Sequence, residues 1–259
     1  MSITFEHQLY TERELIQRVW DIEDVMSLMN RRVYYTAQGL RRQELNDLWV
    51  RESDHRKTAS FGRNYGYYLG MDEIARYYVA EHEEQRQAIL DEYCAAYPEI
   101  ENIPANLNIG FTALAPASTP VVEIARDRAT ARGIWYSIAQ ETTGRPGGKS
   151  QAIWRGEKVA ADFVREGGEW KIWHLVITTD YTNPAGVRHE DEPFSYAPGT
   201  DPLEVEFGRP TTPVLTHDNR YHWSDDYPYV PDPYETFTPG QSYAPEGHRK
   251  LGSKGGLLR

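Results

Sequence analysis

The sequence predicts an α+β fold in which helices come first and antiparallel strands follow. Up to Pro98, apolar residues recur every three or four positions, which is the spacing of amphipathic helices. From Asn106 to Thr179 they alternate or are β-branched and aromatic, which is typical of strands. From Asn183 onward neither period persists, and this stretch holds 11 of the 16 prolines. We therefore expect an α+β domain at residues 1–182 and an extended Pro/Tyr-rich C-terminal arm at residues 183–259.

The first helix is predicted from its start signal and its apolar stripe. Thr11 and Glu14 have the spacing of a capping box, in which each side chain satisfies a free backbone amide of the other residue. The apolar stripe that follows consists of Leu15, Val19, Ile22, Val25, Met26, Met29 and Val33. Gly39 is suited to end this helix.

The remaining elements are predicted from the spacing of apolar residues and from residues that end helices. Residues 41–50 favour a second helix, and residues 57–61 and 65–69 favour two short strands. A third helix is expected from Met71 until Pro98 prevents its continuation. Five strands are then expected at residues 107–114, 121–125, 129–141, 152–165 and 169–179.

The last of these strands has two apolar faces. Strict alternation places Trp170, Ile172, His174, Val176 and Thr178 on one face, and Trp173, Leu175 and Ile177 on the other. A strand of an antiparallel sheet commonly offers one face to water. We therefore expect the second face to pack against another subunit or against the arm.

Composition excludes several classes of function. The net charge of −11 argues against a surface that neutralises nucleic-acid phosphates or binds an anionic membrane. The single cysteine, Cys94, cannot form an intramolecular disulfide, and the first residues lack a signal-peptide pattern, so a cytoplasmic protein is expected. No stretch has the length of apolar sequence that a membrane-spanning helix needs. Neither metal-ligand spacing nor a cofactor motif is present, and we expect no metal and no organic cofactor.

Residues 162–174 carry a resemblance to a known family. They read Asp-Phe-Val-Arg-Glu-Gly-Gly-Glu-Trp-Lys-Ile-Trp-His, a strand that turns through glycines into a Trp-x-Ile-x-His strand. This hairpin, together with three preceding helices, resembles the SnoaL-like branch of the nuclear transport factor 2-like superfamily over about residues 11–182. The resemblance implies a cone in which a curved antiparallel sheet wraps around three helices and encloses a mostly apolar cavity. Relatives use that cavity for cyclisation, isomerisation, dehydration or binding.

The chain is also similar, more weakly, to the lignin-derived diarylpropane γ-formaldehyde lyase group. Enzymes of this group remove formaldehyde from an aromatic diol, leave a stilbene and need no cofactor. The resemblance therefore implies a cofactor-independent lyase acting on a small aromatic molecule.

Four residues are the candidates for proton transfer. His174 is expected to line the cavity, where an imidazole can move a proton; the alternative is a core histidine satisfied by a backbone carbonyl. Tyr34 is expected to donate a hydrogen bond to developing negative charge, although Tyr35 could face the cavity in its place. Asp54 could orient His55 at the entry to the first strand, and an exposed charged turn is the competing interpretation.

Substrate-binding candidates are mainly aromatic. Tyr35, Tyr65, Tyr67, Trp135 and Tyr136 could wall an aromatic ligand, although alternation sends Trp135 and Tyr136 to opposite faces. Arg132 and Asp180 are polar candidates, because a buried arginine could hold a phenolate or carboxylate. Ordinary core positions and strand ends are the alternatives for all of them.

Three functions remain open on the sequence. The leading one is an acid–base lyase of a small aromatic molecule. The second is a polyketide cyclase or dehydratase, or a ketosteroid-type isomerase, which needs a carboxylate base such as Asp54 or Asp180 inside the cavity. The third is a ligand-binding or assembly module, since fold does not fix function. An apolar outer sheet face also predicts a homodimer or homotrimer.

Overall fold

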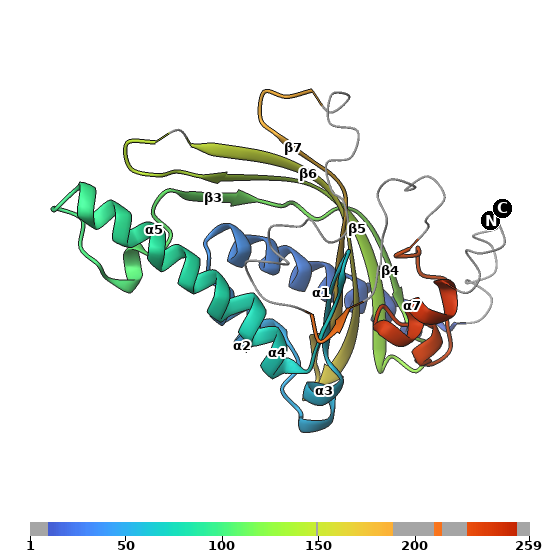
Figure 1. The fold of residues 1–259 in the computed structure, drawn as a ribbon. Coiled ribbons are helices and arrows are strands. Elements are labelled where there is room, and N and C mark those ends of the chain that lie inside the picture. The colour runs from blue at the N-terminus through green and yellow to red at the C-terminus, as the bar shows by residue number, and fades with distance from the viewer. Residues whose placement is uncertain (1–9, 149, 189–209, 214–226, 253–259) are drawn as a thin grey trace.

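The computed structural model describes residues 10–148, 150–188, 210–213 and 227–252. Its helices lie on the concave side of one curved sheet, and a C-terminal segment lies on the convex side (Figure 1). The helical elements are α1 (Glu12–Ala37), α2 (Arg41–Leu48), α3 (Ser53–Thr58), α4 (Met71–Ala75), the π-helix η2 (Arg76–Glu81), α5 (His82–Ala96) and the 3₁₀ turn η3 (Pro104–Asn106), followed in the arm by η6 (Pro239–Gln241) and α7 (Pro245–Gly252). The α+β prediction is confirmed, and residues 53–58, part of a predicted strand and the turn before it, form a short helix.

The sheet has the order β3-β5-β6-β7-β1-β2-β8, and β4 pairs with β5. Its strands are β1 (Ser60–Arg63), β2 (Gly66–Leu69), β3 (Phe111–Leu114), β4 (Ser118–Ile124), β5 (Thr130–Thr143), β6 (Gln151–Glu166), β7 (Glu169–Pro184) and β8 (Thr212–Pro213). All pairings are antiparallel except that of β1 with β7. The long β5-β6-β7 meander therefore supplies most of the concave surface.

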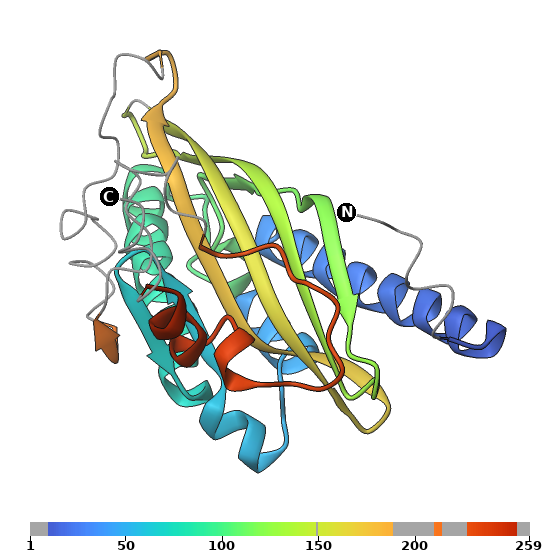
Figure 2. The same cartoon turned by 90° about the vertical axis from the view of Figure 1, so that its right-hand side faces the viewer.

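The two sheet faces carry different neighbours. The inner face, which contacts the helices, presents apolar side chains that form the main core: Ala131, Trp135, Val159, Ala161, Phe163, Ile172, Leu175 and Ile177. The outer face presents Ile134, Ala160 and Val176, which pack against Tyr227 and Tyr243 of the arm. Figure 2 shows this part of the arm crossing the outer face. Of the two covers expected for that face, the structure shows the chain's own arm.

Helix α1 starts as predicted but buries a different stripe. Thr11 and Glu14 form the capping box. The buried residues are Asp21, Val25, Leu28, Met29, Arg32 and Thr36. Val19, expected in the stripe, is 59% exposed, and Figure 2 shows the first turns of α1 extending beyond the sheet. The C-terminal half of α1 thus brings polar side chains, Arg32 and Thr36, into the interior.

The predicted third helix contains a π-helical turn. Helix α4 continues through η2 into α5 without a break in the chain. Tyr77, Tyr78 and Val79 are all at most 3% exposed. A wider turn changes the angular spacing of successive side chains, and such turns occur frequently at functional sites. Here it directs two adjacent tyrosines toward the interior.

No helix among the described residues is long and apolar enough to cross a membrane.

Candidate functional site

A buried charged cluster lies between α1, α2 and η2. The Tyr78 hydroxyl donates to Glu44 at 2.8 Å and accepts hydrogen bonds from Arg41 at 2.5 Å and from Arg32 at 3.2 Å. Arg32 Nε also lies 3.2 Å from Glu44 Oε1, and the Glu44 side chain is fully buried. Burial raises the pKa of Tyr78, so its phenol keeps its hydrogen. The cluster fixes the position of this phenol from two helices.

Aromatic rings continue from this cluster toward β1 and β2. Tyr77 stacks on Tyr68 with ring centroids 4.0 Å apart, and Phe61 contacts both Tyr77 and Tyr78. The Tyr65 and Tyr77 hydroxyls are 3.1 Å apart. Two hydroxyls carry two hydrogens and only one can lie between them, so this pair can donate the other hydrogen to a third acceptor.

His82 follows the π-helical turn directly. Its Nδ1 lies 3.0 Å from the Tyr77 carbonyl oxygen, which can only accept, so Nδ1 carries the hydrogen and Nε2 is the acceptor nitrogen. Burial, helped by the charges of Arg41, Arg86 and Arg63, lowers the pKa of His82 to about 3. The ring is therefore neutral at physiological pH, which is the state a proton acceptor needs.

The inner sheet face adds charged residues opposite η2. Glu157 accepts a hydrogen bond from Thr179 at 3.3 Å and lies 3.8 Å from Arg63 Nη1. Arg155 donates to Glu141 at 2.8 Å. These residues lie on β5, β6, β7 and β1. In this part of the sheet, the positions that face inward are polar instead of apolar. The arrangement can hold a polar molecule against an aromatic wall and transfer a proton to or from it.

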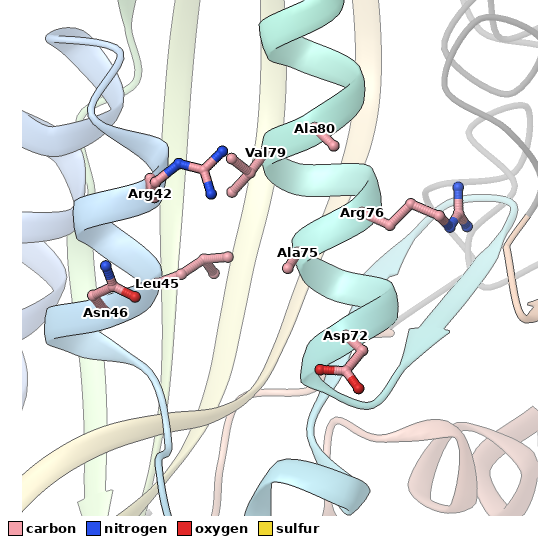
Figure 3. Close-up of a pocket in the computed structure, with 8 residues that line it drawn as sticks. All are labelled: Arg42, Leu45, Asn46, Asp72, Ala75, Arg76, Val79 and Ala80. Carbon is pink, nitrogen blue, oxygen red and sulfur yellow. The ribbon is translucent and has the colours of Figure 1, made fainter.

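A separate pocket of about 350 Å³ opens between α2 and the α4–η2 segment (Figure 3). Leu45 and Val79 face each other across it, and Ala75 and Ala80 leave room beside them. Leu45 and Val79 directly follow Glu44 and Tyr78 in the sequence. The pocket lining is therefore adjacent in sequence to two members of the buried charged cluster.

Comparison with known proteins identifies the family. The model of the SnoaL-like domain matches residues 17–176, more than half of the chain. The chain belongs to the SnoaL-like family. No functionally curated protein matches the sequence.

Solved structures similar to this SnoaL-like chain have low sequence identity to it. A provisionally named scytalone dehydratase from Novosphingobium aromaticivorans has a TM-score of 0.45 and 11% identity, over 70% of this chain and 95% of that one. A provisionally named dehydratase of the NTF2-like family from Streptomyces avermitilis has a TM-score of 0.42 and 14% identity, over 62% and 97%. A hexachlorocyclohexane dehydrochlorinase from Novosphingobium barchaimii has a TM-score of 0.41 and 14% identity, over 69% and 97%.

The expected orientation of His174 in the SnoaL-like domain is wrong. Asp162 pairs with His174 and Phe163 pairs with Ile172, so Trp173 is the extra residue of a β-bulge. The bulge shifts the alternation by one residue and turns His174 to the outer face. There its Nδ1 lies 2.8 Å from Asp162 Oδ2 and its Nε2 lies 3.2 Å from the Thr58 carbonyl oxygen. Both nitrogens thus face acceptors, which favours the alternative of a structural histidine.

Four more candidates lie on the outer face. Arg132 is buried 3.5 Å from Asp162 and under the Tyr243 ring, and the Tyr67 hydroxyl is 2.6 Å from that of Tyr227. Tyr136 is 55% exposed. Asp180, which forms a second irregularity of β7, lies 3.9 Å from Lys158. None of these contacts reaches the interior cluster, by which we mean the buried charged cluster around Tyr78, the adjoining Tyr65–Tyr77 pair and His82.

The candidates on α1 and α3 are also separated from the interior cluster. Tyr34 is 68% exposed, and the Tyr35 hydroxyl donates to Asp47 at 2.8 Å. Asp54 is exposed in the first turn of α3. His55 is half-buried, and its Nδ1 lies 2.7 Å from Glu166.

Glu166 explains the position of His55. Its carboxylate also accepts the backbone N–H groups of Arg51 and Glu52, and these hydrogen bonds, together with that from His55, outweigh burial and lower its pKa. Glu52, His55 and Glu166 place one potential metal-ligand atom each within 4.8 Å of one another. Because Glu166 already holds the amides that precede α3, the group has a structural explanation.

Only Tyr65 and Trp135 among the predicted residues lie within the interior. Trp135 packs edge to face on Phe163 at 6.2 Å, and Tyr65 bonds to Tyr77. Sequence reasoning missed Arg32, Glu44, Tyr78 and His82. Arg32 and Thr36 continue the three- and four-residue spacing from Val25 and Met29, so polar residues within an apolar stripe were the available signal.

Proposed function

We propose that this SnoaL-like domain is a cofactor-independent lyase that performs acid–base elimination on a small aromatic molecule at the interior cluster. The observation that carries the proposal is His82, a neutral imidazole whose hydrogen is held on Nδ1 by the Tyr77 carbonyl. Its Nε2 is the proton acceptor. The Tyr65–Tyr77 pair, whose second ring lies 5.7 Å from the His82 ring, is the proton donor.

Elimination from a benzylic alcohol needs these two groups. The phenol pair protonates the departing benzylic hydroxyl, which leaves as water. In a diarylpropane diol, His82 takes the proton of the terminal hydroxyl, the adjacent carbon–carbon bond breaks, and its electrons form the stilbene double bond while formaldehyde leaves. The atoms and charges balance without an oxidant or reductant, and proton transfer from His82 back to the phenols restores the site.

The aromatic surroundings support an aromatic substrate. Phe61 and Tyr68 are each at most 2% exposed, and their rings contact Tyr77 of the phenol pair. Water is scarce among such side chains, which strengthens hydrogen bonds to developing charge.

An isomerase or cyclase is the second candidate, because two buried carboxylates, Glu44 and Glu157, lie in the interior. The bases expected for it do not favour it, since Asp54 is exposed and Asp180 pairs with Lys158. Glu44 and Glu157 each already face an arginine, Arg32 and Arg63 respectively. A binding or assembly role remains the third candidate.

The test uses a diarylpropane diol, with formaldehyde and stilbene absorbance as the two readouts. We expect both products, and a loss of kcat of about 100-fold or more in His82→Gln, which matches the usual contribution of a general base. His55→Gln is the matched control, because that histidine lies at the surface helix α3, and it should retain kcat. Absence of both products would remove the diol assignment, and full activity of His82→Gln would remove the site.

A further inference from the structure

Arg86 is a buried cation held by neutral groups. It lies on α5, one turn after His82, and is 6% exposed. Its Nη1 donates to the Asn108 side-chain oxygen, and its guanidinium lies over the Phe111 ring at 4.1 Å from the centroid. Within the described part of the chain, Nη2 is buried and has no hydrogen-bond partner, and no carboxylate forms an ion pair with Arg86.

The backbone around Arg86 is shaped to admit it. Gly39 has a φ of +71°, and a Cβ at this position would lie 2.2 Å from Arg86 Nη1 and 2.3 Å from Asn108. Asn108 is itself fixed because its amide donates to the Gln38 carbonyl at 2.9 Å. The end of α1, the loop before β3 and α5 therefore converge to hold a guanidinium in one place.

Arg41 brings a second positive charge to the same region. Its Nη1 binds Tyr78 and Thr36, while its Nε is buried without a hydrogen-bond partner among the described residues. Burial lowers the pKa of Arg86 to about 10, and the charge of Arg41 acts in the same direction, against the opposing charges of Glu141 and Glu83, neither of which forms an ion pair with Arg86 in the described residues. Buried charges in proteins are normally paired, so two neighbouring guanidiniums of which one has no carboxylate leave a deficit of negative charge.

The chemistry of the available donors defines the missing partner. An N–H on Arg86 Nη2 and the N–H on Arg41 Nε are two donors on two cations, which suits the two oxygens of a carboxylate. The rings of Phe111 and Tyr78 lie against these guanidiniums, at 4.1 Å and 4.6 Å. An aromatic group next to the anion would therefore meet aromatic neighbours.

We propose that Arg86 and Arg41 bind the carboxylate of a small aromatic acid and thereby position its ring beside His82. The inference rests on the proposed function in that it names the substrate class of the same site. Binding of the anion has a second effect, because it offsets the cationic charges that act on His82. The imidazole then becomes a stronger base only when the acid is present.

The experiment measures binding and not turnover. Benzoate and its neutral isostere benzamide are titrated into the full-length protein by calorimetry, and the His82 imidazole is followed by NMR. We expect benzoate to bind at least about tenfold more tightly than benzamide, and to raise the pKa of His82. Arg86→Gln should weaken benzoate at least about tenfold while its Tm stays equal or rises, since an uncompensated buried charge is removed. Arg42→Gln, on the exposed side of α2, is the control and should bind benzoate normally.

The binding results test the carboxylate site independently of whether the protein is a lyase. Equal affinity for benzoate and benzamide, or unchanged benzoate binding by a folded Arg86→Gln protein, would overturn it. Inorganic phosphate that binds as tightly as benzoate would overturn the assignment to an aromatic carboxylate. Benzoate binding that depends on Arg86 in a protein without diol turnover would support the anion site and remove the diol assignment.

Discussion

Asp162 and His174 form a buried contact on the outer face of the sheet, with Oδ2 and Nδ1 2.8 Å apart. The arm completes this pair. The Ser242 hydroxyl donates to the same Asp162 oxygen at 2.6 Å, and the Tyr243 N–H donates to it at 2.8 Å. Three donors from β7 and the arm therefore converge on one carboxylate oxygen, which anchors the arm at a defined point of β6.

Ser242→Ala should loosen that anchor. It removes a hydrogen bond to a buried carboxylate and leaves the Ala244 N–H without its 2.9 Å acceptor. We expect the free energy of unfolding in urea to fall by about 1–3 kcal/mol, the usual effect of leaving buried polar groups unsatisfied. Thr238→Ala, at an exposed site of the same segment, should change it by less than about 0.5 kcal/mol. Equal effects of the two substitutions would contradict this role of Ser242.

Glu44→Gln should be among the most destabilising substitutions of α2. It removes the negative charge that faces Arg32 and Arg41, so one buried and one part-buried guanidinium lose their counter-charge. Breaking a buried pair in this way costs about 3–5 kcal/mol. Glu83→Gln breaks the exposed pair with Arg42 and should cost about 0–1 kcal/mol. Urea unfolding of both variants measures the contrast, and a Glu44→Gln effect as small as that of Glu83→Gln would show that the cluster is not tightly buried.

His82 should make stability depend on pH in the acidic range. Burial and three arginines lower its pKa from 6.5 to about 3, so between these values the unfolded chain binds a proton that the folded chain does not. Stability from this group is complete above about pH 6.5 and declines as the pH falls toward 3, by at most about 1.4 kcal/mol per pH unit.

The comparison of His82→Gln with the wild type isolates this contribution. The variant should lose less stability than the wild type between pH 7 and pH 5, as measured by urea unfolding at each pH. In NMR, the wild-type His82 resonance should not titrate across the same range. A His82 ring that takes a proton near pH 6.5 would disprove its neutral state.

The fold was predictable because its signals are local. The capping box at Thr11, the breaker at Pro98 and the alternation in β5 and β6 each depend on residues close in sequence. The candidate site was less accessible, because it depends on side-chain direction. A bulge at Trp173 and a π-helical turn at residues 76–81 both change that direction, and neither has a composition that reveals it.

Polar residues in apolar patterns were the best remaining clue. Arg32 occupies a stripe position of α1, and His82 and Arg86 are one turn apart on α5. The pattern shows that such residues are unusual, but it cannot show that Arg32 meets Glu44 and Tyr78 from two other helices. Those contacts join residues far apart in the chain, with separations of up to 46 positions.

The bulge at Trp173 makes the effect of a one-residue deletion in β7 depend on which residue is lost. Substitutions within β7 change one side chain at a time. Deleting Trp173, the extra residue of the bulge, would restore strict alternation and leave His174 opposite Asp162 and Leu175 on the inner face, where they already lie. Deleting Leu175 instead would exchange the inward and outward positions of the residues that follow it as far as the second irregularity, so a one-residue deletion leaves the two faces of the strand unchanged only at the bulge itself.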